Sequence, residues 1–250
     1  MKKLLTVLLG VLMVLSLAGC GSKEETPAPE VDPAPTAANN YADFVAASND
    51  TELELLMSVQ AHQGWWENEG KGVVTVYAQD DDGGYLCYNM EADEATANAM
   101  TPGTLIRVKG YKSEWSGEVE LVDATCEIVA GGYDGKVYDA KDVTSLSGDQ
   151  EALKEYMNQK CLFKELQVSA DGWTYGWDGS GTRGDDIYLN LVCPNDARMT
   201  FVVESYLTGA DSDVYKLVES LQTGDLVDIT CFMYWYEAPQ PHIFEIAKVS

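Results

Sequence analysis

Alternating apolar and polar residues dominate the first half of this chain and restrict it to a small β fold. The alternation is found in five segments, at residues 53–59, 74–78, 85–90, 105–111 and 119–128. A period of two is typical of strands that bury one face. Residues 91–100 lack glycine and proline and predict a short helix. The order is therefore three strands, a helix and two strands, with a bulge predicted where the alternation slips between Leu121 and Val122.

This order of elements resembles the OB-fold, a five-stranded Greek-key barrel with a helix between strands three and four. Several short motifs also look like the OB-type modules of uncharacterised lipoproteins in clostridium-like bacteria. They are Tyr77-Ala78-Gln79-Asp80, Gly83-Gly84-Tyr85, Tyr88-Asn89-Met90, Val108-Lys109-Gly110-Tyr111 and Trp115-Ser116-Gly117-Glu118-Val119-Glu120. The resemblance covers about residues 41–130 and implies a fold, but no ligand.

The second half of the chain repeats this plan in a diverged form. Residues 103–108 (GTLIRV) align with residues 224–229 (GDLVDI), and a matching helix is predicted over 213–221. The other predicted strands are residues 161–168, 186–193, 199–206 and 243–249. Residues 171–185 are an expected insertion between the first two strands of the repeat. The fold class is thus mainly β, with two small OB-like barrels.

The amino terminus carries a secretory signal. Lys2 and Lys3 precede an apolar run too short to span a bilayer permanently, which takes about 20 residues. The run ends at Leu17-Ala18-Gly19-Cys20 and resembles a bacterial lipoprotein signal, which implies cleavage before Cys20, lipidation of its thiol and a place on the extracytoplasmic face of the cell membrane. The expected division is 1–19 signal peptide, 20–40 proline-rich tether, 41–131 first barrel, 132–148 connection and 149–250 second barrel.

The chain is strongly acidic, with a formal net charge of −25. Removal of the signal peptide would take away two lysines and no acid, so the exported form is more negative still. A field of this sign repels phosphate backbones, so nucleic acid is an unlikely partner on charge. The charge is typical of a solvated surface; the alternative is attraction of cationic peptides, amines or divalent ions.

Five cysteines remain once Cys20 is set aside, and an odd number cannot all pair within one chain. Most sit in apolar strand-like runs, where buried free thiols are expected; a disulfide between Cys161 and Cys193 is the alternative. Neither the cysteines nor the two histidines have metal-ligand spacing, so no zinc and no cofactor is predicted. His62 and His242 both read as surface residues.

Aromatic residues gather where OB-folds bind ligands, at the loops between strands one and two and between strands four and five. The candidates for a binding site are Trp173, Tyr175, Trp177, Trp65, Trp66, Trp115, Tyr234 and Trp235. Trp173, Tyr175 and Trp177 lie in the glycine-rich insertion and are the preferred group. The alternative is that some of these rings close the barrel ends or lie between the modules.

The same insertion carries Asp178, Asp185 and Asp186, which could supply oxygen ligands to calcium. A solvated turn is the competing interpretation and the one we favour. No nucleophile elbow, phosphate-binding glycine loop or metalloprotease helix is present, so the chain is not expected to be an enzyme.

These observations favour a membrane-anchored, extracytoplasmic binding or adaptor protein. Its partners would be the membrane, through the lipid, and a peptide or protein ligand, with an oligosaccharide less favoured. One alternative is an envelope carbohydrate-active hydrolase with a carboxylate pair, which an acid-lined concavity between the modules would support. The other is a nucleic-acid-binding OB protein, which requires a basic groove. Arg107, Lys109 and Lys112 are the only compact basic candidate, and three glutamates follow them at 114, 118 and 120.

Overall fold

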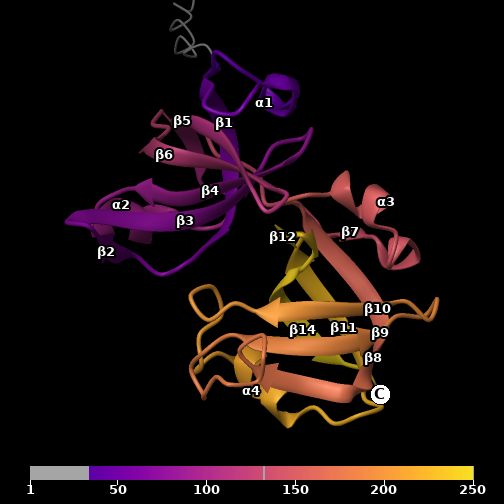
Figure 1. Ribbon diagram of the computed structural model, residues 1–250. Coiled ribbons are helices and arrows are strands. Elements are labelled where there is room, and N and C mark those ends of the chain that lie inside the picture. Colours follow the sequence, from indigo (N-terminus) through magenta and orange to yellow (C-terminus); the bar gives the residue numbers. More distant parts are fainter. Residues whose placement is uncertain (1–33, 132, 250) are drawn as a thin grey trace, which may run out of the picture. The chain divides into compact units, whose positions relative to one another are not determined.

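The computed structural model describes residues 34–131 and 133–249 and is built mainly of strands (Figure 1). The signal peptide and Cys20 lie outside the described residues. Within the described part of the chain, no helix has the length and apolar character needed to cross a membrane.

The first barrel is a closed five-stranded sheet. Its strands are β1 (Glu52–His62), β3 (Lys71–Gln79), β4 (Gly84–Glu91), β5 (Leu105–Trp115) and β6 (Glu118–Ile128), with α2 (Glu94–Ala99) between β4 and β5. The strand order runs β1-β5-β6-β4-β3, and β3 pairs with β1 to close the sheet. β4 and β6 are parallel and the other neighbours are antiparallel. The helix α1 (Tyr41–Ala46) precedes the barrel, and the short β2 (Trp66–Asn68) extends its sheet.

The second barrel repeats this topology. Its strands are β8 (Lys160–Tyr175), β9 (Ile187–Val192), β10 (Arg198–Val203), β11 (Leu226–Phe232) and β14 (His242–Lys248), with α4 (Asp213–Ser220) between β10 and β11. The order β11-β14-β10-β9-β8 closes through β11 and β8, and β10 and β14 are the parallel pair. The shorter elements are β7 (Lys141–Asp142), η1 (Thr144–Leu146), α3 (Gln150–Lys154), β12 (Trp235–Tyr236) and β13 (Ala238–Pro239). The predicted fold class, two OB-like barrels with a helix between strands three and four, is confirmed.

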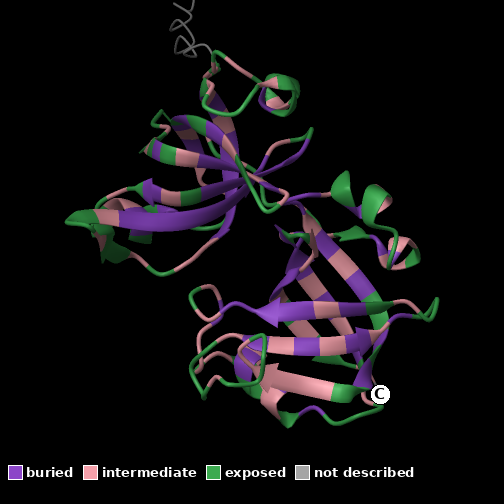
Figure 2. Cartoon of the chain, in the orientation of Figure 1, coloured by how far each residue is buried: buried purple, intermediate pink, exposed green. Residues whose placement is uncertain are grey.

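Each barrel has its own apolar core, and the sequence alternation explains it (Figure 2). In β1, Leu53, Leu55 and Met57 are buried, while Glu54 and Leu56 between them are only partly buried. The helices begin where a side chain can accept from a free backbone N–H: Asp93 accepts from Thr96 at α2, and Ser212 accepts from Tyr215 at α4. The alternation thus determines which face of each strand is buried, and the caps determine where the helices begin.

Two details differ from the sequence prediction. The bulge in β6 lies at Asp123, which has a φ of 47°, one to two residues beyond the predicted slip. β8 also continues through Tyr175, so the first part of the expected insertion is strand. A register shift after Val168 lets Trp173 pair with Leu189 and Tyr175 with Ile187. The strand signal was hidden because glycines flank this short aromatic alternation.

A small apolar cluster joins the barrels. It contains Ala61, Tyr77 and Leu86 of the first barrel and Phe232 of the second. The Tyr77 and Phe232 rings stack with centroids 4.5 Å apart and an interplanar angle of 18°. At the same junction, the Lys160 backbone N–H donates to Gln79 Oε1 at 2.7 Å. The barrels therefore meet through buried apolar contact as well as polar contacts.

Five cysteines of the described residues are free thiols, namely Cys87, Cys126, Cys161, Cys193 and Cys231. The alternative disulfide between Cys161 and Cys193 is not formed. Cys161 lies opposite Cys231 in the ladder between β8 and β11. Burial raises the pKa of the Cys161 thiol to about 12, which keeps it protonated at neutral pH.

Candidate functional site

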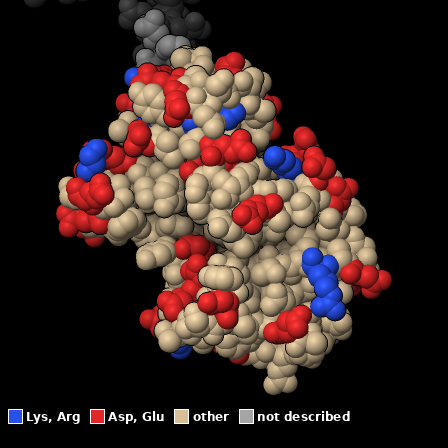
Figure 3. All heavy atoms as spheres, viewed as in Figure 1, with Lys and Arg blue, Asp and Glu red and all other residues tan. Residues whose placement is uncertain are grey.

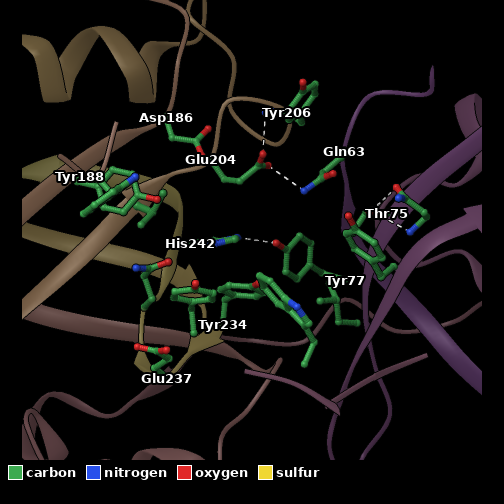
Figure 4. A pocket seen from close by; sticks show the side chains of 18 of the residues that line it. Gln63, Thr75, Tyr77, Asp186, Tyr188, Glu204, Tyr206, Tyr234, Glu237 and His242 are labelled. Carbon is green, nitrogen blue, oxygen red and sulfur yellow. Dashed lines mark hydrogen bonds between the residues drawn. The ribbon is translucent and has the colours of Figure 1, made fainter. Parts of the chain in front are cut away.

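A cleft of about 880 Å³ lies between the two barrels (Figure 4). The first barrel contributes Gln63, Trp66, Thr75, Tyr77, Leu86, Tyr88, Asn89 and Trp115. The second contributes Trp177, Asp186, Tyr188, Val202, Glu204, Tyr206, Tyr234, Tyr236, Glu237, Gln240 and His242. Its volume is typical of sites for small organic ligands, which run from roughly 300 to 1,000 Å³.

Both barrels use the same part of the fold to build this cleft. OB-folds bind ligands on strands two and three, between the loops that join strands one to two and four to five. In the first barrel these are β3 and β4, framed by Trp66 and Trp115. In the second they are β9 and β10, framed by Trp177 and Tyr236. The two ligand-binding faces thus open into a single space.

Strand alternation explains which side chains reach the cleft. In β3, Val74, Val76 and Ala78 belong to the barrel core, so Thr75 and Tyr77 between them point outward. Tyr88 of β4 follows the buried Cys87 in the same way. The outward face of these strands, which usually meets water, here forms one wall of the cleft.

The cleft collects nearly all of the exposed aromatic side chains. Seven tryptophan and tyrosine residues of the described chain are exposed, and six of them line this cleft; Tyr111 is the exception. Rings from the two barrels meet here, since Trp115 and Tyr236 have centroids 5.1 Å apart at 46°. Such a concentration of exposed apolar surface marks an interaction site.

His242 and Tyr77 form a neutral polar pair at the floor of the cleft. The Tyr77 hydroxyl and His242 Nδ1 are hydrogen-bonded at 2.7 Å, and Tyr234 stacks on the imidazole with centroids 4.1 Å apart. Burial lowers the pKa of His242 to about 3, so the imidazole is uncharged at neutral pH. The expectation that His242 is a surface residue is wrong, because β14 begins there and packs it against the first barrel.

Glu204 is the most constrained carboxylate of the site. Its Oε2 accepts from Gln63 Nε2 of the first barrel at 2.9 Å, and its Oε1 accepts from the Tyr206 backbone N–H at 3.2 Å. The residue is 8% exposed, and this burial, with a smaller contribution from nearby Asp186, raises the pKa of Glu204 to about 7. A protonation change at this position therefore falls in the neutral range.

The cleft carries negative charge only. Asp186 and Glu237 join Glu204 among the lining residues, and none of these lining residues is lysine or arginine. On the face drawn in Figure 3, acidic side chains are spread over both barrels and basic ones are few. An acid-lined concavity between the barrels is the feature that would support the hydrolase alternative. A hydrolytic pair also needs a defined separation across the substrate, so that alternative stays a prediction.

The structure places four of the eight candidate aromatic residues in the cleft, namely Trp66, Trp115, Trp177 and Tyr234. The other four are Trp65, Trp173, Tyr175 and Trp235, and each packs against a barrel core. Trp65 donates its indole N–H to the carbonyl of Ala92 at 2.9 Å. The three preferred residues of the insertion therefore do not form one exposed group. Trp173 and Tyr175 pack against the core of the second barrel, whereas Trp177 is 79% exposed.

The three candidate calcium ligands accept backbone hydrogen bonds, two of them within the insertion and Asp186 from another segment. Asp178 Oδ1 accepts from the Ser180 N–H, Asp185 Oδ2 from the Thr182 N–H, and Asp186 Oδ1 from the Ser205 N–H. In residues 34–131 and 133–249, no group of three or more histidine, cysteine, aspartate or glutamate residues could hold a metal ion.

Sequence reasoning missed Tyr88, Tyr188, Tyr206 and Glu204. A signal for two of them exists: Tyr88 and Tyr188 both occupy polar-face positions on ligand-binding strands of the two repeats. Glu204 had no such signal, because it is one of 41 acidic residues in the chain.

We expect the aromatic residues of the insertion to differ sharply in their effect on stability. Trp173→Ala removes a half-buried ring from the core of the second barrel and should lower the free energy of unfolding by about 2 kcal/mol. Trp177→Ala should change it by less than about 0.5 kcal/mol, because the ring is exposed. Urea denaturation of both variants measures this difference; equal losses would show that the two rings are not divided as described.

No family model matches the sequence, and no curated protein matches it. Solved structures do match. A murine DNA-binding protein bound to double-stranded DNA is 11% identical with a TM-score of 0.38, over 79% of this chain and 96% of that one. A replication protein A heterotrimer bound to single-stranded DNA is 12% identical with a TM-score of 0.34, and the match covers 80% of this chain and 51% of that one. The single-stranded DNA-binding protein of Thermus aquaticus is 9% identical with a TM-score of 0.29, and the match covers 82% of this chain and 95% of that one.

These matches contradict two expectations. The matched OB-fold structures are of nucleic-acid-binding proteins, which fits the nucleic-acid alternative better than the main interpretation, a membrane-anchored adaptor. The expectation that nucleic acid is an unlikely partner is contradicted for the same reason. It rested on the negative net charge and on the scarcity of basic residues for a groove, whereas an OB-fold can also hold bases by stacking them on aromatic rings. At this level of similarity, the likeness itself concerns the fold.

Proposed function

We propose that this protein binds a small organic ligand in the cleft between its barrels, with a flat part of the ligand stacked on aromatic side chains. The observation that carries the proposal is that six of the seven exposed tryptophan and tyrosine residues of the described chain line this one cavity. Flat rings of this kind contribute large contact area at low entropic cost.

The rings come from both barrels, which favours a ligand held between them. Trp115 and Tyr236 approach from opposite barrels, and Tyr234 is already stacked on His242. Gln63, which hydrogen-bonds Glu204 across the cleft, and the neutral pair of Tyr77 and His242 provide polar groups beside the rings. Pockets that combine aromatic walls with a few fixed polar groups are typical small-molecule sites.

A second candidate is single-stranded nucleic acid, favoured by the OB topology of both barrels and by rings on which bases can stack. Because no lining residue is lysine or arginine, such binding would rest on stacking more than on phosphate contacts. Its affinity for a labelled 12-nucleotide oligothymidylate would then change little with salt. Fluorescence anisotropy at 20 and 200 mM salt tests this; no binding at either salt would exclude the candidate.

For the small-ligand proposal, Tyr236→Ala is expected to weaken binding of 2-phenylethanol, a neutral ring-bearing probe, by about tenfold, or about 1.4 kcal/mol. Tyr111→Ala is the matched control, since Tyr111 is 38% exposed against 41% for Tyr236 but lies outside the cleft. The control should bind the probe as the natural sequence does. Calorimetric titration measures all three proteins, and equal loss in both variants would contradict the assignment of the site.

A further inference from the structure

We propose, resting on the function proposed above, that the ligand of the cleft is an organic cation: a molecule with a flat or apolar body and an ammonium head held between tyrosine faces and the carboxylates of Glu204 and Asp186. Two independent features of the cavity support this choice, the character of its walls and the sign of its charges.

The walls suit a cation because of their aromatic faces. Nine tryptophan and tyrosine side chains line the cleft. The face of an aromatic ring carries negative potential and attracts an ammonium group within about 6 Å of its centroid. Several rings around one space strengthen this attraction, which is the usual way in which proteins recognise alkylammonium groups.

The charges agree with the walls. Glu204 and Asp186 lie on one side of the cleft and Glu237 lies on the other (Figure 4). None of the ion pairs of the described residues includes any of these three carboxylates. Of the three, Glu204 is buried, Asp186 is partly buried and Glu237 is exposed. Negative charge at the buried Glu204 without a counter-ion is costly, and a bound cation would relieve that cost.

The carboxylates are also held in place before a ligand arrives. Gln63 and the Tyr206 backbone fix Glu204, and the Ser205 backbone N–H donates to Asp186 Oδ1 at 2.8 Å. An anion would face three carboxylates and no lysine or arginine among the lining residues. A bare metal ion prefers several oxygen ligands, which walls made of aromatic rings do not supply. An organic cation uses both kinds of group.

The test varies the charge of one probe and keeps its ring. Phenethylamine, 2-phenylethanol and 3-phenylpropanoate share a phenylethyl body and carry a positive, neutral and negative head, respectively. At pH 8 and low salt, we expect calorimetry to show the amine binding at least tenfold more tightly than the alcohol, and the carboxylate binding least. An alcohol that binds as tightly as the amine would overturn the cation proposal and leave the ring-binding function standing. Failure of all three probes would overturn both.

Glu204→Gln is the decisive variant, because the amide keeps an acceptor for the Tyr206 N–H and removes the charge. Affinity for phenethylamine should fall about tenfold and affinity for 2-phenylethanol should stay within twofold. Glu151→Gln, on the exposed first turn of α3, controls for the change in net charge and should alter neither. If the natural protein, Glu204→Gln and Glu151→Gln all bound phenethylamine equally tightly, Glu204 would have no part in binding the cation. Thermal melting checks that each variant is folded.

The binding should also depend on pH. Because burial raises the pKa of Glu204 to about 7, its negative charge develops between pH 6 and pH 8, while the amine of the probe stays protonated. The groups that face or adjoin Glu204 are Asp186, Tyr77, Tyr188, Tyr206, Gln63 and the neutral His242. Phenethylamine affinity should rise several-fold across this range in the natural sequence and stay flat in Glu204→Gln. A rise of the same size in the variant would assign the effect to another group.

Discussion

Raising the pH from 5 to 9 is expected to destabilise the folded protein strongly, because Glu118 must lose a proton inside the junction between the barrels. Its side chain is 0% exposed, and burial raises the pKa of Glu118 to about 8. A carboxyl whose pKa is raised on folding stabilises the fold below its unfolded pKa and loses that contribution as pH rises through the folded value. The unfolded reference is 4.5, so the loss falls between about pH 5 and pH 8.

The local geometry gives an independent reason for protonated Glu118. Glu118 Oε2 accepts from the Trp235 backbone N–H at 2.8 Å. Glu118 Oε1 and Asn158 Oδ1 are both buried acceptors without a hydrogen-bond donor, and the two side chains adjoin. An ionised Glu118 would leave Oε1 as a buried charged acceptor with no hydrogen-bond partner, which disfavours the charged form.

Glu118→Gln isolates this effect, since the amide keeps an acceptor for the Trp235 N–H and cannot titrate. The free energy of unfolding of the natural protein should fall between pH 5 and pH 9 by on the order of 4 kcal/mol more than that of the variant. Glu204, whose pKa is also raised by burial, titrates in both proteins, so the comparison cancels its contribution. Urea denaturation at several pH values gives the comparison, and parallel curves would rule out the titration of Glu118.

The second large effect is expected at Tyr77, where the two barrels meet. Tyr77→Ala removes a fully buried ring that stacks on Phe232 and hydrogen-bonds His242. The cost should be about 4 kcal/mol, from the cavity, with the lost hydrogen bond in addition. The cleft should lose its probe binding as well, because Tyr77 forms part of its floor.

Tyr77→Phe separates the two contributions. It keeps the ring and leaves His242 without its partner, so it should cost only about 1–2 kcal/mol. Urea denaturation measures both variants. If the alanine variant lost no more stability than the phenylalanine variant, the stacked cluster would not be what holds the barrels together.

Most of the fold could be predicted from the sequence, because each strand of a small barrel shows its buried face as a period of two. β1 and β5 are examples, and glycine and proline mark the helix end at residues 101–103. The end of β8 could not be predicted in this way. Trp173 and Tyr175 alternate with Thr174, but the register shift that pairs them with β9 depends on the partner strand.

The site could be predicted only in part. Loop position directed attention to Trp66, Trp115 and Trp177, which the structure places in the cleft. It could not separate Trp66 from its neighbour Trp65, which alternation turns toward the barrel core. Which faces of the two barrels meet is decided by tertiary contacts such as that between Tyr77 and Phe232, which leave no local pattern. Glu204 is important only because of the burial that those contacts create.

The central claim is that the two ligand-binding faces make one shared site, and the number of bound ligands tests it most directly. Calorimetric titration with phenethylamine at pH 8 should give one site per chain. Gly84→Ala should abolish that site, because a Cβ at Gly84 would lie 2.4 Å from the backbone carbon of Asn158 in the second barrel and push the barrels apart. Gly64→Ala, which meets nothing within 4 Å, should leave it intact. Two equivalent sites per chain, both retained in Gly84→Ala, would contradict a cleft formed jointly by the barrels.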